Sequence, residues 1–259
     1  MSLVEVKKHG PSGTIILSRS EKRNALSRGL IGDLKQAFFD LYQEKSVKAV
    51  ILTGAGSAFC AGMDLKEMLQ ASQEQDPHLV WQQDAEIYQE LLEQMLQFPK
   101  PIIAAVNGPA MAGGGGLVLA CDIILGSPTA TFGFPEPKRG LVAGMVSPML
   151  AFRIGGGKAT NLLLTARTLS AQEAFEWGVF HELLEEEKLW ARAHEIACEC
   201  SESAPSALML TKRVVYETIG EYLQTQLGSG AAHSAAARST PSAKEGLAAF
   251  LEKREPSWD

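Results

Sequence analysis

The sequence predicts an α/β domain with parallel strands, on two observations about its apolar segments. Several short apolar runs lack polar alternation, and strands covered on both faces of a sheet have this pattern. These runs are Gly13–Leu17, Val47–Leu52, Ile102–Val106 and Ile123–Leu125. Segments of helical character lie between them, and this alternation favours a parallel sheet with helices on its faces.

The helices are predicted from apolar spacing and from capping residues. Residues three and four apart mark one helix face, namely Leu30, Ile31, Leu34, Ala37, Phe38 and Leu41. Ser170 and Glu173 form a capping-box pattern, which predicts a helix that begins there and ends near Gly178. The polar stretch from Leu69 to Trp81 predicts either a mobile flap beside a ligand pocket or a surface loop without a role.

The last quarter of the chain is predicted to be helical. Helical segments cover Glu195–Ser201, Leu208–Tyr222 and Gly246–Arg254. A helical tail of this length buries little apolar surface by itself. The pattern therefore favours packing against a partner chain.

Composition bounds the class of protein. At 259 residues, the chain is long enough for one large domain or for a domain with an appendage. Its net charge of −6 disfavours nucleic-acid binding, which needs clustered positive charge. No apolar segment has the length of a membrane span, and the N-terminal residues lack a signal-peptide pattern. We expect a cytoplasmic protein, although a processed organellar protein would have the same composition.

The glycine run Gly113–Gly116 is the most informative local feature. It lies between an apolar strand and an apolar helix that continues through Leu117. Glycine costs backbone entropy, so four in a row at a helix start need a reason. Two reasons fit: access of a ligand oxygen to the N–H groups of the first turn, or a close contact between helix and strand.

Another glycine turn, earlier in the chain, favours the ligand explanation; we call it the first turn and the Gly113–Gly116 run the second. The strand over Val47–Leu52 leads through Gly54–Gly56 to Phe59–Asp64, and a helix is predicted over Leu65–Leu69. Two such turns can bring two main-chain N–H donors to one point. A pair of this kind is an oxyanion hole, which stabilises a developing enolate or tetrahedral oxyanion.

These two turns resemble the oxyanion segments of the crotonase (enoyl-CoA hydratase/isomerase) superfamily. The resemblance rests on Phe59–Lys66 and on Lys100–Gly108 with the glycine run. It continues in the same order through Cys121–Ile124, Phe132–Glu136, Leu163–Ala166, Ser170–Ala174, Glu245–Phe250 and Glu252–Arg254. Each motif alone is weakly specific, whereas the ordered set covers nearly the whole chain.

The resemblance implies a fold, an assembly and a substrate class. It implies a crotonase-like spiral of β-β-α turns with the CoA and acyl site over residues 1–195, and a helical trimerisation region over residues 196–259. A homotrimer, or a hexamer made as a dimer of trimers, is implied as well. The substrate is implied to be an acyl-CoA thioester. No cofactor is expected, because coenzyme A is part of the substrate, and no metal site is expected.

The resemblance also assigns catalytic roles. The backbone N–H groups of Met63 and Gly113 are implied to hold the thioester carbonyl, and Glu136 is implied to act as general acid and base. Glu136 lies in the apolar, proline-stiffened segment Phe132–Pro137, which can desolvate a carboxylate and raise its pKa. From the residues alone, an exposed loop glutamate is the alternative.

Coenzyme A contacts are implied at two places. At the first place, main-chain groups are implied to bind coenzyme A, and Lys22 and Lys66 are implied to offer charge to its phosphates. The residues of this place are Lys22, Arg23, Ala25, Ala61, Asp64, Leu65 and Lys66. Phe250 and Lys253 are implied to reach a coenzyme A held by the neighbouring subunit. For each lysine the alternative is a solvated surface charge. Cys60 lies beside the proposed site, and the cysteine spacing matches no zinc pattern, so structural thiols are expected.

Gly116, which the resemblance places at the substrate site, departs from the two-glutamate hydratases, because these carry their other catalytic glutamate there. A sole glutamate at the Glu136 position is the pattern of some Δ3,Δ2-enoyl-CoA isomerases and of hydratases of the methylglutaconyl-CoA hydratase type. The segment Lys138–Pro148 favours the second group. We expect a 2-enoyl-CoA hydratase, with a branched or carboxylated acyl chain among its candidate substrates. The isomerase and a catalytically impaired acyl-CoA-binding homologue are the alternatives. Arg139 is either a bidentate partner of a substrate carboxylate or a surface residue.

Overall fold

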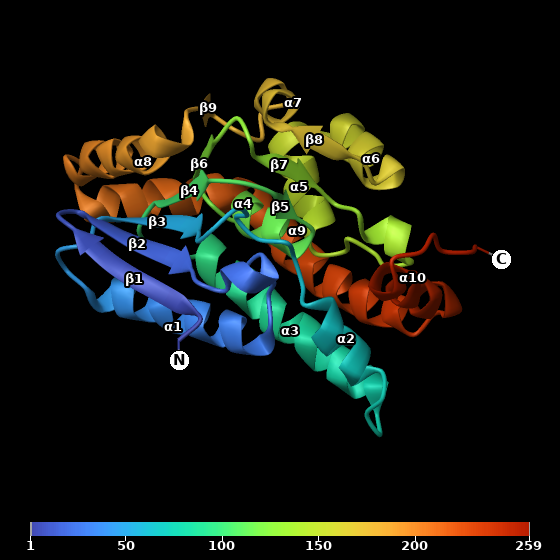
Figure 1. Ribbon diagram of the computed structural model, residues 1–259. Coiled ribbons are helices and arrows are strands. Elements are labelled where there is room, and N and C mark those ends of the chain that lie inside the picture. The colour runs from blue at the N-terminus through green and yellow to red at the C-terminus, as the bar shows by residue number, and fades with distance from the viewer. Residues whose placement is uncertain (1, 259) are drawn as a thin grey trace.

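Two β-sheets form the centre of the molecule (Figure 1). The computed structural model describes residues 2–258, with the side chains of residues 218–222 outside the description. The larger sheet consists of β1 (Val4–His9), β2 (Ser12–Leu17), β3 (Ala49–Gly54), β4 (Ile102–Val106), β6 (Ile123–Gly126) and β9 (Glu182–Leu183), paired in that order. Its neighbouring strands are parallel apart from the antiparallel pair β1–β2. The smaller sheet consists of β5 (Ala110–Met111), β7 (Thr131–Gly133) and β8 (Thr168–Ser170).

Helices cover both faces of the larger sheet (Figure 1). The α-helices are α1 (Arg28–Gln43), α2 (Leu65–Ala71), α3 (Pro77–Leu96), α4 (Gly113–Leu119), α5 (Val146–Ile154), α6 (Gly156–Thr165), α7 (Ala171–Glu176), α8 (Glu186–Ser201), α9 (Pro205–Arg238) and α10 (Pro241–Glu252). Two short 3-10 helices are η1 (Ser20–Lys22) and η2 (Glu136–Arg139). Helix α9 packs along α3 and α5, and α10 packs against η2.

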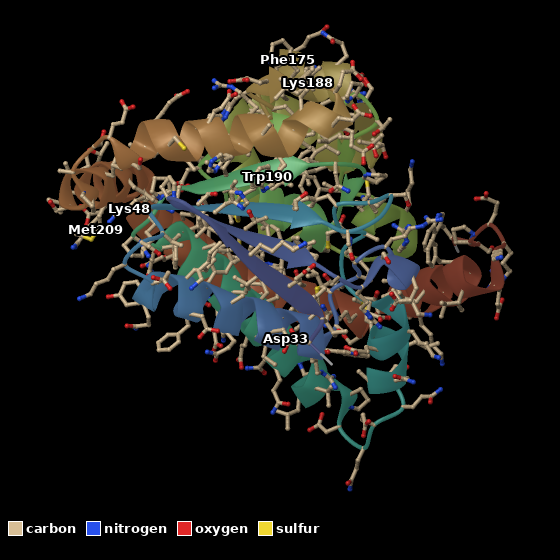
Figure 2. The ribbon with its side chains drawn as sticks, turned by 60° about the vertical axis from the view of Figure 1, so that its left-hand side comes forward. Asp33, Lys48, Phe175, Lys188, Trp190 and Met209 are labelled. Carbon is tan, nitrogen blue, oxygen red and sulfur yellow. The ribbon has the colours of Figure 1, made fainter. Side chains whose placement is uncertain are left out.

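Strands β3 and β4 are apolar throughout because both of their faces are buried. Val50 and Leu52 of β3 join the main core with residues of α1 and α3. Ile51 of β3 points to the opposite face and joins a second core cluster with residues of α8. Trp190 of α8 lies where this helix meets the sheet, and its indole Nε1 donates to Thr14 Oγ1 of β2 at 3.0 Å (Figure 2).

Several local predictions are confirmed. All six residues of the predicted α1 face are buried, and β4 spans Ile102–Val106 as predicted. The capping box of Ser170 and Glu173 is present at the start of α7, and Gly178 follows this helix with a φ of 86°. Strand β1 is missing from the sequence prediction because it lies at the sheet edge and is mostly exposed, so its residues carry no apolar signal.

Of the two alternatives for Leu69–Trp81, the structure favours a short surface connection over a flap beside a ligand pocket. Helix α2 continues to Ala71 and α3 begins at Pro77, so only residues 72–76 connect them. The Asp76 side chain caps α3 by accepting from the N–H of Leu79, and proline is favoured at the first helical position. Most polar residues of this stretch form the exposed connection 72–76, and no residue from Leu69 to Trp81 lines the cavity described below.

The C-terminal helices are longer than predicted. Helix α8 begins at Glu186, and α9 runs without a break to Arg238. Small residues after position 227 weaken the apolar period of α9, and the close packing of this helix requires them. A side chain on Gly230 would place its Cβ 2.6 Å from the backbone of Gly144. Among residues 2–258, no helix is both long and apolar enough to cross a membrane.

Candidate active site

A cavity of about 530 Å³ lies between the two glycine turns, η2 and α10. This volume is in the range of about 300–1,000 Å³ that is usual for small-molecule sites. The cavity brings together most of the site residues expected from the sequence: Lys22, Arg23, Ala25, Ala61, Met63, Asp64, Leu65, Lys66, Gly113, Glu136 and Phe250. Gly116 and Lys253 do not line it.

The first turn presents the N–H of Met63. On either side of this residue, the Gly62 carbonyl accepts from the N–H of Leu26 at 2.8 Å, and the Asp64 N–H donates to the Leu26 carbonyl at 2.9 Å. This is a parallel bridge between Leu26 and Met63, so the N–H of Met63 points away from Leu26. Within the described residues, that N–H has no backbone acceptor.

The second turn presents the N–H of Gly113. The N–H of Ala112 donates to the Gly133 carbonyl at 2.8 Å, and Gly113 then begins α4. The first N–H groups of a helix have no partner inside it, and that of Gly113 has no backbone acceptor among the described residues. Ala112 adopts a φ of 52° and a ψ of −124°, a strained conformation for a residue with a Cβ.

The two turns touch each other. A side chain on Gly62, where φ is 93°, would place its Cβ 2.7 Å from the Ala112 Cβ and 3.2 Å from the Gly113 nitrogen. A Cβ on Gly114 would overlap the carbonyl oxygen of Cys60. Glycine at these two positions therefore permits the close approach that places both donor residues on one cavity wall.

Glu136 begins η2 and is half-buried, with one carboxylate oxygen shielded from solvent. Its Oε2 is buried and has no hydrogen-bond partner among the described residues. Burial raises the pKa of Glu136 to about 7, against a smaller opposing effect of its own backbone N–H and of the nearby Arg139 charge. The expected pKa shift is confirmed in direction, and a carboxyl with this pKa can both accept and donate a proton near neutral pH.

Arg139 lies in the cavity wall and is only partly exposed. Its guanidinium carbon is 4.4 Å from the centroid of the Phe250 ring, which is a cation–π contact. Its Nε is buried without a hydrogen-bond partner in the described part of the chain. Arg139 is therefore a half-buried residue of the cavity wall, and its pairing with a substrate carboxylate stays a prediction.

Tyr88 of α3 is a cavity residue that sequence reasoning missed. It is 2% exposed and its hydroxyl donates to the Gly113 carbonyl at 2.6 Å. The sequence signal was a tyrosine on the apolar face of a helix, since a buried phenol needs a hydrogen-bond partner. The partner lies 25 positions away in the chain and cannot be identified from the sequence.

Three cations lie at the exposed mouth of the cavity. The side chains of Lys22, Arg23 and Lys66 are exposed, and none of the three forms an ion pair with a described residue. In a chain with a net charge of −6, this group is a local positive region. Such a region fits the phosphates of an anionic ligand.

Asp64 differs from these cations because it is held in place. Its carboxylate caps α2 by accepting from the N–H groups of Lys66 and Glu67, and its Oδ2 lies 2.7 Å from Arg19 Nη1. Burial raises the pKa of Asp64, but these hydrogen bonds outweigh burial and lower the pKa below its usual value. The carboxylate is therefore a structural anchor of the first turn.

Three expected site residues differ in where the structure places them. Gly116 is buried behind Tyr88, because a Cβ on Gly116 would overlap the Tyr88 hydroxyl. Lys253 caps the C-terminus of α10 with a φ of 56° and lies outside the lining. Phe250 lines the cavity of its own chain, because α10 packs on η2, and its contact with a coenzyme A of a neighbouring subunit stays a prediction, as does that of Lys253. Cys60 is fully buried and burial raises its pKa to about 12, as suits a structural thiol.

Comparison with known proteins identifies the family of this chain. Residues 12–259 match the sequence profile of the enoyl-CoA hydratase/isomerase family. A putative enoyl-CoA hydratase of Thermus thermophilus is 38% identical over 99% of this chain and 100% of its own length. A 1,2-epoxyphenylacetyl-CoA isomerase of Escherichia coli is 30% identical over 95% of this chain and 94% of its own length.

A solved structure shares the fold. It is an enoyl-CoA hydratase/isomerase from Xanthobacter autotrophicus, with a TM-score of 0.89, 28% identity and coverage of 98% of this chain and 97% of the other. The crotonase-like α/β fold with C-terminal helices is thereby confirmed. The chain belongs to the enoyl-CoA hydratase/isomerase family and is an enzyme of the crotonase superfamily.

Proposed function

We propose that the protein is an enoyl-CoA hydratase, which adds water across the α,β double bond of a 2-enoyl-CoA thioester. One observation carries the proposal. Glu136, Met63 and Gly113 line the same cavity, and among the described residues the buried Oε2 of Glu136 has no hydrogen-bond partner and the N–H groups of Met63 and Gly113 have no backbone acceptor. A proton acceptor and a pair of oxyanion donors are the two parts that this addition needs.

The reaction proceeds with one carboxylate. Glu136 takes a proton from water while the water oxygen bonds to the β carbon. The electron pair of the double bond moves toward the thioester carbonyl, and the resulting enolate oxygen accepts from the N–H groups of Met63 and Gly113. The protonated Glu136 then delivers its proton to the α carbon. The sum is one water added, and the carboxylate is regenerated.

The substrate's coenzyme A extends across the cavity mouth. Lys22, Arg23 and Lys66 are the unpaired cations that meet its phosphates, and Ala25, Ala61 and Leu65 offer main-chain groups nearby. Phe250 closes the same cavity from α10. Gly116 and Lys253 have no direct contact in this proposal.

A carboxylated acyl chain is the substrate type that the cavity wall favours. Arg139 lines the cavity with a buried Nε that lacks a partner among the described residues, and a substrate carboxylate would satisfy it. Arg139→Met keeps the length of the side chain and removes the charge. We expect this variant to lose at least about tenfold in kcat/KM for a carboxylated enoyl-CoA and to keep its rate with a neutral chain of equal length.

Isomerisation of a 3-enoyl-CoA is the second candidate activity. Of the two carboxylates that line the cavity, Asp64 is paired with Arg19, so Glu136 alone is available. One carboxylate is sufficient to move a proton between two carbons, and this move needs no water. The presence or absence of solvent oxygen in the product separates the two activities.

The test is a panel of 2-enoyl-CoA and 3-enoyl-CoA thioesters incubated with the enzyme in water labelled with heavy oxygen. Hydration predicts loss of ultraviolet absorbance from the conjugated 2-enoyl thioester, together with one heavy oxygen in the 3-hydroxyacyl product. A 3-enoyl substrate converted to its unlabelled 2-enoyl isomer, without hydration of any 2-enoyl thioester, would contradict the hydratase. No turnover of any thioester would support the impaired, binding-only homologue.

A homotrimer, or a dimer of trimers, is the assembly we propose. Several large apolar side chains are exposed on the single chain, including Leu164 at 80% and Leu210 and Val215 of α9. Apolar surface that gathers on exposed helices is typical of subunit interfaces. Light scattering of the purified protein tests this, and a monomeric mass at micromolar concentration would contradict it.

A further inference from the structure

Tyr88 is a buried cavity residue for which the reaction above gives no role. It lies on the buried face of α3, and its hydroxyl donates to the carbonyl of Gly113 at 2.6 Å. That carbonyl belongs to the same residue whose N–H is the proposed second oxyanion donor. A contact with the donor residue itself calls for a functional explanation.

The start of α4 lacks the restraints that usually fix a helix N-terminus. Ala112 is the N-cap residue, and it makes no side-chain hydrogen bond. The four residues that follow, Gly113–Gly116, are glycines, which have the largest backbone freedom. The orientation of the Gly113 N–H therefore depends on contacts that come from outside α4.

Tyr88 provides such contacts at two points. Besides its hydrogen bond, its ring covers Gly113, because a Cβ on this glycine would lie 3.5 Å from both Cζ and Oη of Tyr88. A Cβ on Gly116, one turn further, would overlap the same hydroxyl. Burial, with smaller effects from the Cys60 and Glu136 charges, raises the pKa of Tyr88 well above its usual value, so the phenol keeps the proton that it donates.

We propose that Tyr88 is a positioning residue of the oxyanion hole. Its hydroxyl and ring hold the N-terminal residues of α4, so that the Gly113 N–H points at the thioester oxygen. The proposal rests on the function proposed above, because it acts through that donor. It also accounts for Gly116: the phenol occupies the space that a side chain at this position would need.

Tyr88→Phe tests the hydroxyl while keeping the ring. A misdirected donor costs less than a lost one, for which the rate falls about 10²- to 10³-fold. We expect kcat to fall about 10- to 100-fold and KM to stay within about twofold, because the bond matters mainly in the transition state. Tyr42→Phe is the matched control, since Tyr42 is exposed on α1 outside the cavity, and it should keep the wild-type rate.

A binding spectrum provides a readout that simple core packing would not move. An aromatic 2-enoyl thioester such as cinnamoyl-CoA absorbs at longer wavelength when its carbonyl is polarised by hydrogen bonds. We expect a shift on binding to the wild type, the loss of about half of it or more in Tyr88→Phe at saturation, and the full shift in Tyr42→Phe. A Tyr88→Phe enzyme that retains both its kcat and the spectral shift would overturn the proposal.

Hydrogen exchange separates positioning from loss of the fold. If Tyr88 is a positioning residue, amide exchange in Tyr88→Phe should be faster in the α4 segment and unchanged elsewhere. Faster exchange over the whole chain would show a merely structural role and overturn the proposal. The two hypotheses also fail separately. A wild type that shows the spectral shift but hydrates nothing refutes the hydratase, and the loss of that shift in Tyr88→Phe would still support positioning.

Discussion

The two turns of the proposed oxyanion hole differ in how their donors are held. Around Met63, the chain is fixed on both sides by backbone hydrogen bonds to Leu26. The helix that follows is capped by Asp64, which is itself paired with Arg19. The Met63 donor is therefore held by hydrogen bonds that the residues on either side of it form, mostly through the backbone.

Around Gly113, a backbone hydrogen bond holds one side only, from the Ala112 N–H to the Gly133 carbonyl, and a side chain adds a further restraint. The helix that begins there has no side-chain cap, and the residue before it is strained. Tyr88 reaches it from α3, and Cys60 touches it from the first turn. The difference teaches that one hole can combine a donor held by backbone hydrogen bonds on both sides with a donor held partly by a side chain from another helix. The second donor should therefore be the more sensitive to remote substitutions.

Glu136→Gln removes the group that accepts and donates the proton, and it has the largest expected effect. We predict a fall in hydration kcat of about 10³-fold, because the amide cannot take a proton from water. Both turns should stay intact, since the buried Oε2 has no hydrogen-bond partner within residues 2–258 as described. Steady-state kinetics measure the effect, with Glu187→Gln on exposed α8 as the control. Activity within about threefold of the wild type would remove Glu136 from the mechanism.

Gly114→Ala breaks the contact between the two turns. The added Cβ would overlap the Cys60 carbonyl oxygen and lie 2.7 Å from the Cys60 Cβ, and backbone atoms cannot move aside cheaply. We predict a loss of about 3 kcal/mol in the free energy of unfolding, measured by urea denaturation. Gly157→Ala in α6 is the matched control, because nothing lies within 4 Å of its added Cβ. Equal stability of the two variants would show that the turns do not depend on each other.

The pH dependence of stability distinguishes the Glu136 carboxyl, in the cavity wall, from the Asp64 carboxyl, which anchors the first turn. The pKa of Glu136 rises from 4.5 to about 7 on folding, so the folded state binds more protons in this window. Stability should fall as pH rises from about 4.5 to 7, by about 2–3 kcal/mol, and this fall should be absent in Glu136→Gln. Asp64 has the opposite sign: its lowered pKa stabilises the fold above about pH 4, and the effect is lost in more acidic solution.

The same pKa of Glu136 predicts a rate profile. The carboxylate must be deprotonated to accept a proton from water, so kcat/KM should rise with pH and level off above about 7. Initial rates across this range, with stability checked at each pH, measure the profile. A kcat/KM that stays at its plateau value from about pH 8 down to about pH 5 would contradict Glu136 as the base.

Asp64→Ala has the smallest expected effect, and it tests the first turn alone. Loss of an N-cap costs about 1 kcal/mol of stability. Because Leu26 still holds Met63 through the backbone, we predict a fall in kcat of about threefold or less, well below that of Tyr88→Phe. If Asp64→Ala had a lower kcat than Tyr88→Phe, the first donor and not the second would be the more sensitive one.

Local features of this molecule could be predicted from its sequence. The buried face of α1, the strand β4, the α7 capping box and the two glycine turns all depend on residues close together in the chain. Their apolar spacing and capping chemistry are visible without a structure. The candidate site residues followed from the ordered motifs and not from composition.

Features that depend on distant packing could not be predicted. The contact of Tyr88 with Gly113 joins α3 to α4, and the packing of α10 on η2 places Phe250 in the cavity of its own chain. The length of α9 was hidden because its close contact with Gly144 requires small residues, which carry no apolar period. The sequence contains these residues without indicating what they touch.

The most direct test of the oxyanion hole is a crystal structure of Glu136→Gln with a 2-enoyl-CoA bound, since this variant should stall the reaction. The account predicts that the thioester oxygen lies about 2.7–3.1 Å from both the Met63 and the Gly113 nitrogen, with the double bond facing residue 136. A thioester oxygen that meets neither nitrogen, or only one of them, would contradict it.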